Sequence, residues 1–284
     1  MHHPVRPAHA MALSALVLLL LPAASMLILD RLGGPLTPAA TALAAGIGAG
    51  ALAIAGGIAW RRGGYKLRWS PLNIAELAIL ATALLGGFGY LLWLAGWPLL
   101  PIGTSVDGAW HYGLADHLTQ VRQLGVSHAR VSDVDSYTPG YHLLAVALAH
   151  WSGAEPIYTV YPASAALLAL AIGATVQAAM DAAPPDATRV LAGGGALALL
   201  ALLPRTATIE IITDQNFYPT AAGLAYMLAA AWAAGLLHRS GRRIAWLPLG
   251  AALLGIIICY PFWLPIALAL VVALAVARHW RDWR

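Results

Sequence analysis

Eight long apolar runs constrain this chain more than any other feature of its sequence. They cover residues 8–29, 37–60, 71–95, 157–180, 188–204, 217–237, 244–260 and 262–278. Each is nearly free of charge and close in length to the roughly 20 residues that cross a bilayer as a helix. A mean hydropathy of +0.73 agrees with this pattern. We therefore predict an all-α integral membrane protein with about eight transmembrane helices.

Basic residues between these runs predict the orientation of the chain. Ten of the sixteen Lys and Arg residues lie in three short segments, 61–68, 238–243 and 278–284. If the N-terminus is inside and eight helices cross, all three fall on one side, which the positive-inside rule assigns to the cytoplasm. Eight of the twelve acidic residues fall on the other side. We expect a multi-pass protein of the cell membrane with both termini cytoplasmic and an extracytoplasmic loop at 96–156.

Composition and short motifs exclude several classes of protein. The net charge of +4 would suit nucleic-acid binding, but the basic residues act as topology signals, so no nucleic-acid partner is expected. The single cysteine, Cys259, lies in an apolar run and leaves no disulfide framework or cysteine-based metal site. Walker A, GxGxxG, HExxH and GxSxG motifs are absent, which disfavours ATP-driven transport and the common hydrolase designs.

One apolar stretch in the outer loop, 139–151, is too short to cross a membrane and contains two histidines. We predict a helix lying along the outer membrane surface with its aliphatic side in the lipid boundary, and a short tilted crossing is the alternative. The glycine-rich second run, 37–60, permits close approach to a neighbouring helix.

The first part of the outer loop, 106–124, has helical spacing. A helical wheel places Asp107 and His111 one turn apart, both directed into the apolar arc, and places Asp116 and His117 on a solvated face. A carboxylate that faces a packed surface loses hydration unless it is paired or used in chemistry. Asp107 and His111 are therefore candidates for a general base with its partner, or for two metal ligands. The alternatives are an acid at the helix N-terminus and an ordinary interfacial histidine.

The rest of this loop offers weaker candidates. Asp133 and Asp135 are expected to be ordinary loop acids, with a divalent-cation site as the alternative. The sequence "YTPGYH" predicts a turn followed by a helix start, with Tyr141 and His142 at the mouth of an outer cavity.

The second outer loop contains Arg205 and Asp214. Arg205 is expected either to extend its side chain to the membrane interface or to hold a phosphate bidentately. Asp214 is the strongest functional candidate in the polar run at 210–216, and capping of the helix that follows is the alternative. Glu76, in the third run, is expected to complement the N-terminus of its helix, and an inward-facing proton-relay role is the alternative.

Three segments carry a family resemblance: "SVDGAWHYGLADHL", "YTPGYHLLAVALAHWSGAEPIYTVYPASAALLAL" and "TDQNFYPTAAGLAYML". Together they resemble the GT-C superfamily, membrane glycosyltransferases that use polyprenyl-phosphate sugars, and the middle segment is similar to the "YPPGYHLL" segment of many members. The resemblance covers about residues 70–240. It implies a GT-C-like core at 71–284, preceded by an additional transmembrane hairpin at 1–70. Most relatives are longer, so the chain is expected to be a fragment or a reduced member.

The resemblance also implies roles for single residues. Asp107 corresponds to the essential acid of the first outer loop and would deprotonate the acceptor hydroxyl. His111 and Asp214 would shape the donor site or, with Asp107, ligate a divalent cation such as Mg²⁺ or Mn²⁺. Arg205 would face the donor phosphate, with Tyr141 and His142 also on the substrate side.

Two other functions remain open at this point. One is a secondary transporter or flippase for a lipid-linked substrate, and the other is a non-catalytic assembly subunit with a membrane-protein partner. Transporters usually place ionisable groups in the middle of the membrane. Here the spans are almost free of charge and the acids gather on one side, which favours chemistry at the outer surface and a polyprenyl-phosphate sugar donor in the lipid bilayer.

Overall fold

The computed structural model describes residues 3–96, 99–100, 105–124, 138–202, 207–240 and 245–282. They form helices α1 (Pro7–Arg31), α2 (Pro38–Arg62), α3 (Pro71–Ala95), α4 (Val106–Val121), α5 (Gly140–Ser152), α6 (Val160–Ala182), α7 (Ala187–Leu202), α8 (Ala207–Thr213), α9 (Tyr218–Ser240), α10 (Trp246–Cys259) and α11 (Leu264–Asp282). Two short strands, β1 (His3–Val5) and β2 (Tyr65–Leu67), pair in parallel. Single 3₁₀ turns precede α6 (η2, Pro156–Tyr158) and α11 (η4, Pro261–Trp263). The prediction of an all-α chain is confirmed.

Five of these helices are long and apolar enough to cross a membrane. They are α1, α2, α3, α9, and α6 together with its preceding turn. The other three predicted runs correspond to α7, α10 and the helical segment at Pro261–Ala277, which are apolar but shorter. The structure therefore supports a helical membrane protein, while the number of eight crossings stays a prediction.

Sequence signals explain where the long helices begin. Proline occupies the first turn of α1, α2 and α3, where its missing N–H costs nothing. Thr37 and Ser70 precede two of these prolines, and each side chain accepts a hydrogen bond from a backbone N–H of the first turn. Ser105 caps α4 in the same way.

The core forms around α6, the most buried of the long helices. Helices α1, α3, α7 and α9 pack against it. Gly87 of α3 permits close approach, because a Cβ atom there would lie 3.0 Å from the backbone of Ala169 in α6. By contrast, α2 buries only Thr41 and Ala45. Of the glycines of α2, Gly48 is the one with a neighbour within 4 Å, the side chains of Leu21 and Ser25 in α1, so the close approach that this run permits is used at that position.

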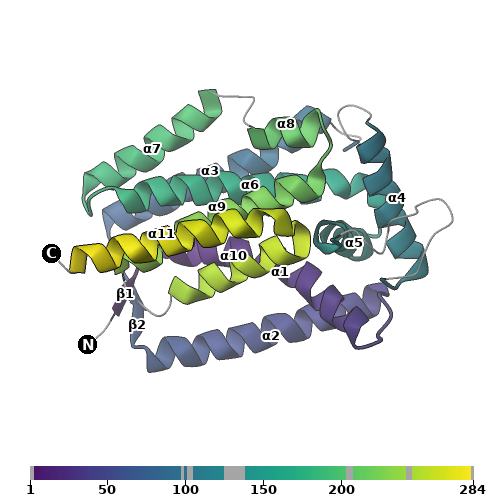
Figure 1. Ribbon diagram of the computed structural model, residues 1–284, viewed down its shortest axis with the longest axis horizontal. Helices are drawn as coiled ribbons and strands as arrows, with labels where there is room; N and C mark the ends of the chain where they lie inside the picture. The colour runs from purple at the N-terminus through teal and green to yellow at the C-terminus, as the bar shows by residue number, and fades with distance from the viewer. Residues whose placement is uncertain are drawn as a thin grey trace.

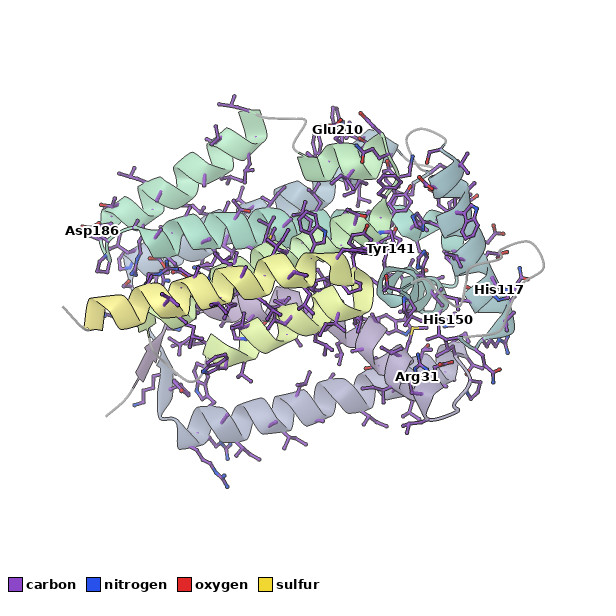
Figure 2. The ribbon with its side chains drawn as sticks, viewed as in Figure 1. Arg31, His117, Tyr141, His150, Asp186 and Glu210 are labelled. Carbon is purple, nitrogen blue, oxygen red and sulfur yellow. The ribbon has the colours of Figure 1, made fainter. Side chains whose placement is uncertain are left out.

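The bundle has two distinct ends (Figure 1). At the end that we call the basic end, α1 and α3 begin, α2 and α9 finish, and both chain termini lie. At the opposite end, which we call the loop end, α4, α5 and α8 gather. Figure 2 shows Asp186 at the basic end and Arg31, His117 and Glu210 at the loop end. The described parts of the three basic segments thus lie at one end as expected, and which end faces the cytoplasm stays a prediction.

Helix α5 differs from its prediction. It does lie across the bundle, seen end-on in Figure 1, but nine of its thirteen residues are buried, so it is not a surface helix in the lipid boundary. The reason is that α1, α4, α6, α9 and α10 all pack against this helix. Gly140 allows its first turn to approach α10, because a Cβ atom there would lie 2.5 Å from the carbonyl oxygen of Ile258. The hydroxyl of Thr138 donates to the Cys259 carbonyl, 2.7 Å away.

Candidate functional site

The first turn of α4 presents Asp107 to the exterior. The Ser105 side chain is the N-cap and accepts the N–H of Gly108 at 2.9 Å. Val106, Asp107 and Ala109 are exposed, whereas Leu114 and Leu118 further along the helix are buried. The prediction that Asp107 faces the apolar arc is therefore wrong, because the first turn extends beyond the surface on which α4 packs. Asp107 still belongs to the first turn of a helix, where the helix dipole favours negative charge.

This turn contacts the second predicted outer loop. A Cβ atom at Gly108 would lie 3.3 Å from Cγ of Asn216, and the Ser105 hydroxyl is 3.5 Å from the Gln215 carbonyl oxygen. Asp214 precedes these two residues, is exposed, and accepts a hydrogen bond from the Thr213 hydroxyl at 2.8 Å. It follows α8 and does not cap α9, so the capping alternative is wrong. Tertiary packing brings together two loops that are about a hundred residues apart in the sequence.

Beneath the turn, two histidines form a buried pair. His111 Nδ1 and His142 Nε2 are 3.0 Å apart, and the residues are 2% and 1% exposed. Burial lowers the pKa of His111 to about 4, and burial together with the neighbouring His111 lowers the pKa of His142 well below its usual value. Both rings are therefore neutral near pH 7, so one donates and the other accepts. His111 faces the packed arc as predicted.

Tyrosines extend this pair into a neutral polar cluster. The hydroxyls of Tyr112 and Tyr218 are 3.0 Å apart, and the Tyr218 hydroxyl donates to Asn216 Oδ1 at 2.7 Å. Tyr141 stacks on Tyr218 with ring centroids 5.4 Å apart, and its own hydroxyl donates to the Val160 carbonyl at 2.8 Å. Burial raises the pKa of Tyr112 to about 12, so its hydroxyl stays protonated. We call His111, His142 and these three tyrosines the His–Tyr cluster.

The His–Tyr cluster corrects one prediction about α5. Tyr141 and His142 are almost fully buried and do not line the mouth of an outer cavity. They lie inside because α5 itself is buried among six helices, α1, α2, α4, α6, α9 and α10. His117, predicted to be solvated, is 4% exposed, since α4 is covered over a wider arc than its apolar residues span. Asp116 is exposed as predicted and accepts from Gln120 at 2.8 Å.

Other predicted site residues lie outside the described part of the chain. Arg205, Asp133 and Asp135 belong to this group. Among the residues that the structure does describe, no three His, Cys, Asp or Glu side chains are arranged to hold a metal ion. The proposed metal set of Asp107, His111 and Asp214 is therefore not assembled, because the two acids are exposed and the histidine is buried in a neutral pair.

A second polar cluster, at the basic end, was not predicted. Arg6 forms ion pairs with Glu76, at 2.7 Å, and with Asp181. Asp181 also lies 3.0 Å from His9 Nε2 and accepts the indole N–H of Trp232 at 2.9 Å. Both carboxylates are 2% exposed. Burial lowers the pKa of Arg6, and the neighbouring Glu76 carboxylate opposes this shift.

This cluster forms one wall of a cavity of about 620 Å³. Its polar lining includes Arg6, His9, Arg68, Asn73, Glu76, Asp181, Asp186, Arg189 and Arg239. Its apolar lining includes Leu13, Trp60, Leu72, Leu236 and Leu247. It is a concave site that combines a group of polar side chains with apolar walls, the usual character of a ligand site.

One signal in the sequence pointed to this cluster. Asp181 lies in the last turn of a long apolar helix, where the helix dipole disfavours an acid. Such a residue requires a cationic partner, and Arg6 stands directly before the first apolar run. The partner itself was not predictable, because the pairing of β1 with β2 and the packing of α1 on α6 bring Arg6 to Asp181.

Comparison with known proteins adds no assignment: no protein-family model, no curated protein and no solved structure matches this chain.

Proposed function

We propose that the loop end is the site of a membrane glycosyltransferase, which transfers a sugar from a polyprenyl-phosphate donor to an acceptor hydroxyl. The proposal starts from the resemblance of three sequence segments to GT-C enzymes. It places the reaction at the exposed first turn of α4, on the extracytoplasmic side of the predicted topology.

The supporting observation is that the three resembling segments converge. Helix α4 comes from the first, α5 from the second, and the turn at 213–217 with the start of α9 from the third. His111 of the first bonds to His142 of the second, and Tyr112 of the first bonds to Tyr218 of the third. Segments that only happened to share residue types would have no reason to meet around one cluster.

Asp107 is the proposed catalytic base. An exposed carboxylate at a helix start is accessible to an acceptor hydroxyl, whereas the His–Tyr cluster is closed. As the acceptor oxygen bonds to the anomeric carbon, its proton passes to Asp107. The bond between that carbon and the phosphate oxygen breaks, and its electron pair leaves with the polyprenyl phosphate. General base catalysis of this kind contributes about 10²–10⁴-fold.

The His–Tyr cluster is proposed to position this turn and not to react. Its rings are neutral and form two hydrogen-bonded pairs, His111 with His142 and Tyr112 with Tyr218, which are in ring contact with each other. Asn216 connects Tyr218 to the position of Gly108. A rigid support of this type holds a catalytic group in place. Asp214 and Gln215 are exposed next to the turn that carries Asp107, and they are the proposed contacts for the donor.

The test is a transfer assay with purified protein in lipid nanodiscs and a panel of synthetic polyprenyl-phosphate hexoses and pentoses. Asp107→Asn should lower the rate at least about 100-fold while keeping thermal stability. Asp116→Asn is the matched control, an exposed acid on the same helix, and should retain the wild-type rate. Unchanged transfer by Asp107→Asn would refute the base assignment, and no transfer from any donor would refute the proposed function.

A further inference from the structure

The cavity at the basic end is a second candidate binding site. The residues that line it come mainly from the ends of α1, α2, α3, α6, α7, α9 and α10 that lie there and from the turn between α6 and α7. These segments meet at the end of the bundle opposite α4, α5 and α8 (Figure 1). The cavity is therefore separate from the proposed site at the loop end.

The acidic and the basic side chains that line the cavity differ in how fully they are paired. The two buried carboxylates, Glu76 and Asp181, are both engaged by Arg6, and Asp181 has His9 and Trp232 as further partners. A third acid, Asp186, is exposed and accepts the backbone N–H of Thr188 at the start of α7. Every acid of the cavity therefore already has a partner.

The remaining arginines of the lining are less fully engaged. Within the described part of the chain, no ion pair is found for Arg68 or Arg239. Arg189 lies 4.0 Å from Glu76, and its Nε donates to the Ala183 carbonyl at 3.5 Å. Three arginines thus line one cavity whose acids already have partners. A guanidinium is a planar fork of donors that matches a phosphate oxygen pair.

Apolar residues also line the cavity. Gly56, Ala59 and Trp60 of α2 are among them, together with Leu72 and Leu247. The C-terminal half of α2 is largely exposed, as expected for a helix surrounded by lipid. The cavity therefore combines positive charge with a hydrocarbon-compatible surface.

We infer that this cavity binds a phosphate group, presented as the headgroup of an anionic amphiphile. Arg189 and Arg239 contact the phosphate, Arg6 stays with its two carboxylates, and the hydrocarbon chain leaves along α2. A volume of about 620 Å³ holds a headgroup and the first part of its chain. In the predicted topology, the amphiphile belongs to the cytoplasmic leaflet.

Native mass spectrometry of the delipidated full chain in detergent tests this inference. Phosphatidic acid and phosphatidylglycerol should bind at micromolar concentration, and zwitterionic phosphatidylcholine at least about tenfold more weakly. Arg189→Gln with Arg239→Gln should weaken binding of the anionic lipids by at least tenfold, with an unchanged melting temperature. Arg62→Gln is the matched control, an exposed arginine at the same end that does not line the cavity, and should bind as wild type.

A further arm of the experiment separates the two possible sources of the phosphate. Inorganic phosphate at millimolar concentration is added to the protein alone and in competition with phosphatidic acid. Weak or no displacement of the lipid supports an amphiphile as the ligand. Binding of inorganic phosphate without any binding of the lipids would overturn the lipid source. Equal binding by the double variant and by wild type would overturn the site, whatever the outcome of the sugar-transfer assay.

Discussion

The two ends of the bundle bury polar side chains in opposite ways. At the loop end, His111 and His142 lose their charge, because burial lowers the pKa of both rings. At the basic end, Glu76 and Asp181 are buried as partners of Arg6 in ion pairs. A polar group can enter a low-dielectric interior by either route. The difference shows that the basic end is built for charge and the loop end for neutral hydrogen bonds.

Removing the central cation should have the largest effect. Arg6→Ala leaves two buried carboxylates without their main partner, which typically costs about 3–5 kcal/mol. Thermal unfolding in detergent should show a large drop in melting temperature. Arg62→Ala, at an exposed position of the same end, should change stability by less than about 0.5 kcal/mol. A stable Arg6→Ala protein would mean that the carboxylates do not carry charge.

Acidification should act mainly on the loop end. The pKa of His111 is lower in the folded protein than its ordinary value of 6.5, so the unfolded chain binds the proton more tightly. The stabilisation is complete above pH 6.5 and is lost as the pH falls toward about 4, at up to about 1.4 kcal/mol per pH unit for each histidine.

The measurement is thermal unfolding between pH 7.5 and 4.5. Wild type should lose stability across this range, and a His111→Gln/His142→Gln variant should lose less, whatever its stability at pH 7.5. If the stability of the two proteins fell equally with decreasing pH, the histidines would not be buried in neutral form.

A single methyl group should distinguish tight from open packing. Gly140→Ala places a Cβ atom against the Ile258 carbonyl and should destabilise the protein by about 1–3 kcal/mol. Gly56→Ala on α2 meets no atom within 4 Å and should be neutral or stabilising by up to about 1 kcal/mol. Chemical unfolding of both variants measures the difference, and equal effects would contradict the packing of α5 on α10.

The sequence predicted several elements because their causes are local. Proline at the first turn and Ser or Thr before it start helices wherever they occur, so α2 and α3 lie close to their expected limits. Charge-free runs also predict apolar helices. Burial was harder to predict: α5 has the composition of an interfacial helix, yet α1, α4 and α10 enclose it.

The same limit applies to the candidate sites: sequence periodicity identified a residue related to its neighbours by short spacing, and it missed residues brought together by packing. His111 was identified because helical periodicity relates it to Leu114 and Leu118 on one face. The same periodicity failed for Asp107, because it cannot show how far a helix extends beyond its neighbours. Tyr218 and Asn216 were missed for a similar reason, since their partners lie in α4, about a hundred residues earlier.

By itself, the sequence determined that this protein is helical, apolar and divided into a basic and an acidic set of connecting segments, because these properties depend on residue type and short spacing. Only the tertiary structure decided that Arg6 meets Glu76 and Asp181, that α5 is enclosed, and that Asp107 is exposed. Such pairings depend on which helices pack together, and hydrophobic attraction between apolar faces is not directional enough to specify the partner in advance.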